Sequence, residues 1–292
     1  MRILLPLGLC LLSVAWSVHA GAVQPAYKAP EVQRLAAKTL RVYEATEADQ
    51  GVAADAQHFY AVDNATIAKY VTASGAAVDK WLGPAGGLIR HLNSCLAVGG
   101  RLWCANSNYS QTPMGSSVEI FDTDTLNHVD THSLGMTEEG SLTWFDRYRS
   151  GWVAGFAHYD DDGGLKYKNH AFSSVVTFDA DWRRTGGWLF PPSTLDRMAP
   201  HAASGGAIGP DGWLYLLGHD RPEMYVVGRP PMGPTLIHLA TIDIEAEGRP
   251  SRGPRTAAVP SSPSTGARAW SGELRLPPSH RSRLESRSPC AS

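Results

Sequence analysis

The stretch that decides the fold covers residues 91–109 and reads His91-Leu-Asn-Ser-Cys-Leu-Ala-Val-Gly-Gly-Arg-Leu-Trp-Cys-Ala-Asn-Ser-Asn-Tyr109. Two short apolar runs flank Gly99-Gly100, a pair that suits a two-residue hairpin turn because both central residues need positive φ. Counting outward from that turn places Val98 opposite Arg101, Ala97 opposite Leu102, Leu96 opposite Trp103 and Cys95 opposite Cys104. The stretch therefore predicts a β-hairpin whose two cysteines face each other.

The facing cysteines predict a cross-strand disulfide between Cys95 and Cys104. By the count from the turn they occupy a non-hydrogen-bonded pair, in which the Cα atoms approach to about 4.5 Å. That separation lies near the short end of disulfide geometry. Two buried thiols are the alternative.

The first residues have the pattern of a secretory signal peptide. Met1-Arg2 precedes an apolar run from Ile3 to Val18, and Val18-His19-Ala20 forms a small-residue cleavage site. The run is too short for a lasting transmembrane helix, and no other run approaches membrane length. We therefore expect cleavage near Ala20, a secreted or periplasmic protein without a membrane span, and an oxidising compartment that favours the disulfide.

Charge is unevenly distributed along the chain. Residues 21–248 contain 17 Lys and Arg against 26 Asp and Glu. Such an acidic body argues against nucleic acid or an anionic membrane as the partner. We expect a monomer that binds a small polar ligand or an exported protein.

Short strands repeat in the same order along residues 40–248, after a polar leader over residues 21–39 in which we expect a short helix around Glu31–Lys38. Each unit has a small-residue strand, a turn, a Trp- or Tyr-containing strand, a polar corner and a third strand with an aromatic residue. These aromatics are Tyr70, Phe121, Phe178 and Tyr225, spaced by 51, 57 and 47 residues. Units of this size with about four strands predict an all-β fold, a β-propeller with four recognisable blades, and a β-sandwich or barrel is the alternative.

These units resemble the secreted bacterial β-propellers with YVTN, NHL and regucalcin/gluconolactonase-like repeats. The block Asn93-Ser-Cys95 through Cys104-Ala-Asn-Ser-Asn-Tyr109 is similar to an uncharacterised exported propeller family. The resemblance covers roughly residues 40–248. It implies the propeller fold, and it leaves the activity open.

The repeat pattern stops at Arg249, and residues 249–292 are rich in Arg, Pro and Ser. Such a composition predicts a disordered tail. One interpretation is a basic arm for an acidic partner. The interpretation that we favour is a frame error near Gly248, because permitted codons for residues 248–253 and 268–274, shifted by one nucleotide, restore two strands of a further blade. Cys290 would then be an accidental thiol.

The polar residues of the units fall on one face of the expected propeller. The first strand of a blade begins, and the second ends, at the same face. This rule gathers candidate ligand-binding residues, namely His91, Asn106, Asn108, Glu139, His158, Asp160, His201, His219 and Asp220, together with Asn93, Ser141, Ser204, Asp49, Gln50, Asp63 and Asn64.

We call this face the funnel face, and three interpretations of its polar residues compete. His91, Glu139, His158, His201 and His219 are candidate ligands for a divalent metal, which would activate water or polarise a carbonyl. Without a metal, the same groups would hydrogen-bond a polar ligand such as a sugar or an organic acid. Alternatively, each is a strand-end residue that hydrogen-bonds the backbone of its neighbour.

Two further patterns have plain structural explanations. The acidic run 160–164 lacks the ligand spacing of an EF-hand loop, so a solvated turn is favoured over a Ca²⁺ site. Trp103, Trp144, Trp152, Trp188 and Trp213 recur at equivalent positions, which favours packing between blades over ligand stacking.

The sequence therefore predicts a propeller that binds a polar small molecule or a partner at its funnel face, with no assigned catalysis. The alternative function is a metal-dependent hydrolase, lyase or cycloisomerase of the lactonase-like kind. The sequence does not match the site residues of gluconolactonase-like or muconate-cyclising propellers one by one, so no catalytic residue is assigned.

Overall fold

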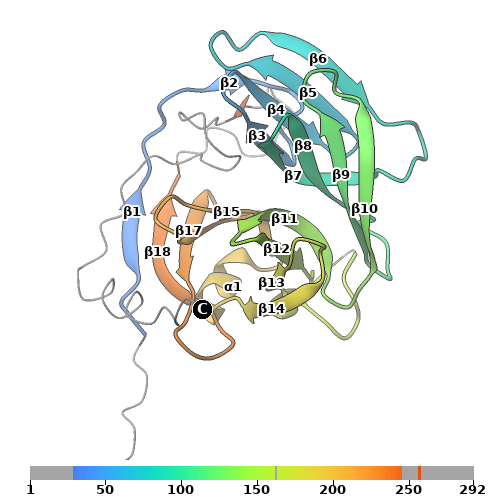
Figure 1. Cartoon of the computed structure of the whole chain (residues 1–292). Helices are drawn as coiled ribbons and strands as arrows, with labels where there is room; N and C mark the ends of the chain where they lie inside the picture. The colour runs from blue at the N-terminus through green and yellow to red at the C-terminus, as the bar shows by residue number, and fades with distance from the viewer. Residues whose placement is uncertain (1–28, 162, 245–255, 258–292) are drawn as a thin grey trace, which may run out of the picture.

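Four antiparallel sheets, each of four consecutive strands, are arranged as a propeller (Figure 1). The structure, a computed structural model, describes residues 29–161, 163–244 and 256–257. The expected signal peptide and most of the expected tail lie outside these residues. Blade 1 contains β3 (Gly51–Ala54), β4 (His58–Asp63), β5 (Thr66–Val71) and β6 (Ala77–Leu82). Blade 2 contains β7 (His91–Val98), β8 (Arg101–Ser107), β9 (Gly115–Asp122) and β10 (His128–Met136).

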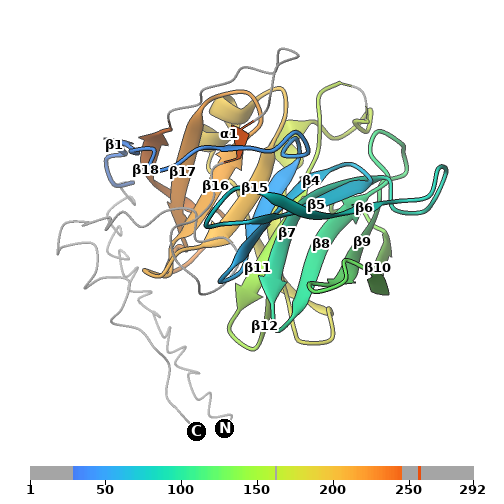
Figure 2. The same cartoon turned by 90° about the horizontal axis from the view of Figure 1, so that it is seen from above.

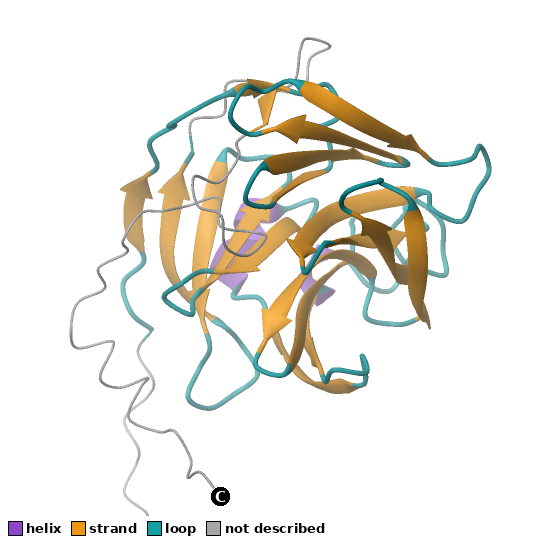
Figure 3. Ribbon diagram, turned by 45° about the horizontal axis from the view of Figure 1, so that its top comes forward, coloured by secondary structure: helices purple, strands orange, loops and turns teal. Residues whose placement is uncertain are grey.

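The second half of the propeller repeats this order. Blade 3 contains β11 (Ser141–Tyr148), β12 (Gly151–Ala157), β13 (Ser174–Phe178) and β14 (Arg184–Leu189). Blade 4 contains β15 (Ala203–Ile208), β16 (Leu214–Gly218), β17 (Glu223–Gly228) and β18 (Ile237–Asp243). The four predicted aromatics all lie on third strands. The all-β propeller with four blades is therefore confirmed. Within the described residues, helix is confined to two short pieces, η1 (His170–Phe172) and α1 (Pro192–Met198), drawn purple in Figure 3.

The hairpin between β7 and β8 has the predicted register. Val98 pairs with Arg101 and Cys95 with Cys104, and Gly99 and Gly100 adopt φ of 62° and 70°. Cys95 and Cys104 form a disulfide with their Cα atoms 4.0 Å apart, which confirms that prediction. The register shifts between Leu92 and Cys95, so the start of β7 is offset from the count that holds nearer the turn.

The first strands of the blades lie next to one another at the centre. Figure 2 shows β7 and β11 side by side in the middle of the molecule, with β10 and β18 at opposite outer sides. The approach is close, because a Cβ added to Gly51 of β3 would lie 2.9 Å from the carbonyl oxygen of Asn93 in β7. Small residues on the first strands thus let the blades pack tightly round the axis.

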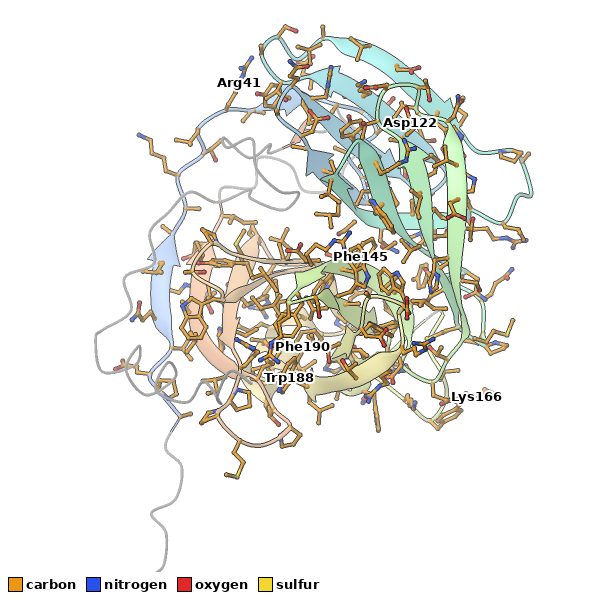
Figure 4. All side chains as sticks on the ribbon, in the orientation of Figure 1. Arg41, Asp122, Phe145, Lys166, Trp188 and Phe190 are labelled. Carbon is orange, nitrogen blue, oxygen red and sulfur yellow. A yellow bond between two sulfur atoms is a disulfide. The ribbon has the colours of Figure 1, made fainter. Side chains whose placement is uncertain are left out.

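Much of the hydrophobic core lies in clusters between neighbouring blades. Trp144 is fully buried between blades 3 and 4, and Trp152 is 2% exposed between blades 2 and 3. Phe145, labelled in Figure 4, packs in the same cluster as Trp152. For these two tryptophans, interblade packing agrees with the sequence-based interpretation. Trp103 and Trp188 are partly buried against clusters of the same kind, whereas Trp213 packs against a cluster whose buried residues all belong to blade 4.

The leader forms a strand, so the helix expected around Glu31–Lys38 was wrong. β1 (Gln33–Ala36) pairs in parallel with β18 and adds a fifth strand to blade 4. Arg34 fixes it there by donating to Asp243 at 2.9 Å and to Glu223 at 3.0 Å. Hydrogen bonds to an open sheet edge outweigh the helix propensity of so short a segment.

From β1 the leader crosses to blade 1, as the blue segment at the left of Figure 1 shows. Arg41, labelled in Figure 4, donates to the carbonyl of Ala73 in blade 1 at 2.8 Å. β2 (Tyr43–Glu44) then pairs with β19 (Thr256–Ala257), so two residues of the expected tail form a strand. The leader thus contacts both blade 1, the first blade in sequence, and blade 4, the last.

The described strands and short helices offer no membrane-spanning helix. Within residues 29–161, 163–244 and 256–257, no helix has the length and apolar character needed to cross a bilayer.

Candidate functional site

A row of aromatic and imidazole rings crosses the face where first strands begin and second strands end. The ring of His91 lies 5.0 Å from that of Tyr109, measured between centroids, and Tyr109 lies 4.9 Å from Tyr159. The row continues from Tyr159 to His201 at 6.5 Å and from His201 to His219 at 4.1 Å. It therefore links residues of blades 2, 3 and 4 on the predicted face. We call these five residues the ring row.

The His91 end of the ring row is joined to blade 1. His91 is the first residue of β7, and its Nδ1 lies 2.6 Å from Oδ1 of Asn64, which follows β4. Since an amide oxygen only accepts, Nδ1 donates and Nε2 keeps its lone pair. Burial lowers the pKa of His91 to about 4. At neutral pH, His91 therefore acts as an uncharged hydrogen-bond acceptor.

The middle of the ring row consists of two tyrosines from equivalent positions. Tyr109 comes two residues after β8, and Tyr159 comes two residues after β12. Burial raises the pKa of Tyr159 well above its ordinary value, so its phenol stays protonated. A Cβ added to Gly163 would lie 2.7 Å from the Tyr109 ring, which shows how closely the loop after β12 packs on this ring.

At the far end of the ring row, the two imidazoles contact one carboxylate, that of Asp220. Nδ1 of His201 lies 2.8 Å from Oδ2 of Asp220, and Nδ1 of His219 lies 2.8 Å from Oδ1. Burial acts to raise the pKa of Asp220, but the hydrogen bonds from His219 and His201 outweigh it and hold that pKa below its ordinary value. Single donor atoms of His201, His219 and Asp220 all lie within 4.8 Å of one another, a spacing compatible with a metal ion.

Two candidate asparagines of blade 2 accept hydrogen bonds from main-chain N–H groups near them. Asn106 is buried, and its Oδ1 accepts from the main-chain N–H groups of Arg90 and His91 at 3.1 and 3.2 Å. Asn108 accepts from the main-chain N–H of Gly115 at 2.8 Å and so closes the loop after β8. Both positions fit the interpretation in which strand-end residues bond the backbone.

The remaining candidates of blade 3 lie outside the ring row. Glu139 accepts from Nε of Arg184 at 2.7 Å. His158 is 1% exposed, and burial lowers its pKa. Asp160 lies 2.8 Å from Nδ1 of His170. Of the five metal candidates, the structure therefore brings His201 and His219 together and places Glu139 in an ion pair.

The sequence-based reasoning missed Tyr109, Tyr159 and Asp161. The signal for the tyrosines was present in the repeat, because both follow the second strand of their blades by two residues. Asp161 has an oxygen 3.7 Å from Nε2 of His201. The sequence placed Asp161 only in an acidic turn.

An apolar hollow lies at the opposite ends of these strands, between blades 3 and 4. Tyr148, the last residue of β11, accepts a hydrogen bond from Arg229 and meets the ring of Trp188 edge-on at 6.4 Å. Tyr148 and Trp188 also pack against the core cluster between these blades. We therefore assign the hollow to interblade packing.

No protein-family model and no curated protein matches the chain. Among solved structures, the chain is similar to Myxococcus xanthus glutaminyl cyclase, with 16% identity and a TM-score of 0.48 over 73% of this chain and 79% of that one. It is also similar to a luciferin-regenerating enzyme, with 13% identity and a TM-score of 0.40 over 70% and 80% of the two chains. A streptogramin B lyase follows, with 6% identity and a TM-score of 0.39 over 65% and 55%. Similarities at this level carry no argument about activity or substrate.

Proposed function

We propose that the protein binds a neutral, hydroxyl-rich small molecule, such as a sugar, along the ring row. The observation that carries this proposal is the unbroken series of ring contacts from His91 to His219. These residues come from three blades, which is how a propeller builds a site from strand ends. Aromatic faces with a few convergent polar groups are the usual lining of small-molecule sites.

The hydrogen-bonding groups in and beside the ring row favour a ligand that donates. Nε2 of His91 is an acceptor, and the carboxylates of Asp161 and Asp220 accept only. A sugar supplies many O–H donors. An organic acid, the other ligand class expected from the sequence, would place its charge beside these carboxylates and is less well suited.

The experiment is calorimetric titration of the full chain with neutral sugars and with the matching uronic acids. We expect neutral sugars to bind, and we expect Tyr109→Ala to weaken binding by about 5-fold, the effect of losing one aromatic contact of about 1 kcal/mol. Tyr148→Ala is the control, because Tyr148 lies at the other end of its blade. The proposal fails if no neutral sugar binds, if the uronic acids bind more tightly, or if Tyr148→Ala weakens binding as much as Tyr109→Ala.

A binding role for an exported protein partner and the alternative of a metal-dependent hydrolase, lyase or cycloisomerase stay predictions. No contact in the described residues favours a protein partner over the sugar, and the spacing of His201, His219 and Asp220, although compatible with a metal ion, does not by itself indicate catalysis.

A further inference from the structure

His201 lies between two carboxylates. Its Nδ1 contacts the carboxylate of Asp220 at 2.8 Å, and its Nε2 faces Oδ2 of Asp161 at 3.7 Å. Each ring nitrogen of His201 thus faces a carboxylate oxygen, and imidazole nitrogens and carboxylate oxygens are atoms that ligate divalent transition metals.

His219 adds a second imidazole to the same group. It also contacts Asp220 through Nδ1 at 2.8 Å, and the two imidazole rings are tilted by 32° with centroids 4.1 Å apart. Three residues, one just before β15 and two just after β16, thus bring nitrogen and oxygen ligand atoms to one place. Donor atoms within 4.8 Å of one another can be joined by one ion with bonds of about 2.0–2.2 Å after small side-chain rotations.

We propose that His201, His219 and Asp220 bind a divalent transition metal ion, with Zn²⁺ as the ion of choice. Two imidazoles and a carboxylate suit Zn²⁺, Co²⁺ or Ni²⁺, whereas Ca²⁺ and Mg²⁺ prefer oxygen ligands alone. Three protein ligands leave a fourth position open for water or for a ligand hydroxyl. Asp161, 51% exposed at its side chain, adds negative charge beside the ion.

This inference goes beyond the proposed function and does not depend on it, because metal binding is measured without a sugar. The full chain is prepared without a polyhistidine tag and titrated with Zn²⁺ by calorimetry and with Co²⁺ by visible absorption. We expect one ion per chain and the ligand-field bands of a four-coordinate Co²⁺ site with nitrogen ligands.

Variants test the assignment of the ligands. His219→Ala and Asp220→Asn should each weaken Zn²⁺ binding by about 10- to 100-fold or more, since loss of a metal ligand costs at least as much as loss of its outer-shell support. Asp161→Asn should weaken it less. His132→Ala is the matched control, because this histidine lies on β10 and stacks on Trp182 at 5.7 Å, away from the ring row.

The proposal is overturned if the wild-type chain binds neither ion at micromolar concentrations, or if His219→Ala and Asp220→Asn keep wild-type affinity. It is also overturned if His132→Ala weakens binding as much as His219→Ala. His219 is 57% exposed at its side chain, so its substitution should leave the fold intact, and circular dichroism checks this. Metal binding without sugar binding would refute the proposed function and leave the metal site standing.

Discussion

Reduction of the Cys95–Cys104 disulfide should destabilise the protein by a calculable amount. The two cysteines are 9 residues apart in sequence. In the chain-entropy description, closing a loop of this size stabilises the folded state by about 2.6 kcal/mol at 25 °C. The Gly99-Gly100 turn already favours the paired strands, which reduces the entropy that the disulfide removes. We therefore expect an effect of about 2 kcal/mol.

The assay is equilibrium unfolding in guanidinium chloride, followed by tryptophan fluorescence, with and without reductant. For a slope of about 5 kcal/mol per molar, the midpoint should fall by about 0.4 M on reduction. The double variant Cys95→Ala, Cys104→Ala is the control, and reductant should leave its midpoint unchanged. A thiol titration of the denatured protein should give two more reactive thiols after reduction than before. The reasoning is refuted if those two thiols appear and the midpoint does not move.

Two further predictions concern acid stability and the packing between blades 3 and 4. Burial lowers the pKa of His238 to about 4. The unfolded chain therefore binds a proton at this histidine near pH 6.5, whereas the folded chain does so only near pH 4. The contribution of His238 to the free energy of unfolding is fully present above pH 6.5 and falls by up to about 3 kcal/mol as the pH falls to 4. Thermal unfolding from pH 7 to 4.5 measures the decline, and His238→Gln should make it shallower, while His91, whose pKa burial also lowers to about 4, keeps its own contribution; an equally steep decline in the variant would contradict the assignment. Gly206→Ala should destabilise by about 1–3 kcal/mol, because the added Cβ would lie 2.5 Å from the Trp144 ring. Gly205→Ala is the neighbouring control, since its Cβ would meet Leu217 at an ordinary 3.6 Å, and equal losses of stability in the two variants would argue against the clash.

The local strands and the register of the hairpin were predictable because their determinants are adjacent in sequence. Gly99-Gly100 fixes the turn, and alternation fixes which residues pair across it, so Cys95 meets Cys104. The pairing of β1 with β18 was not predictable, because its partner is far along the chain and the segment 33–36 has no pattern of its own.

The site was predictable as a face and not as a set of contacts. Strand direction alone gathers His91, His201 and His219 on one face. The hydrogen-bond partner of each polar group depends on loops that the repeat does not specify. Asn106 accepts from the backbone, and Glu139 accepts from Arg184. The rings of Tyr109 and Tyr159 connect the face, and aromatic residues after a strand are as common in cores as in sites.

The parallel pairing of β1 with β18 affects the order in which the protein folds during synthesis. Arg34 and its partner Asp243 are 209 residues apart. At a synthesis rate of about 5–20 residues per second, roughly 10–40 s separate the appearance of the two residues. Throughout that interval β1 has an edge without its native partner, and blade 4 is the last described blade to be made. Contacts of such long sequence separation slow folding, so we expect β1, the first described strand to be made, to dock late in assembly onto β18, the last strand of blade 4.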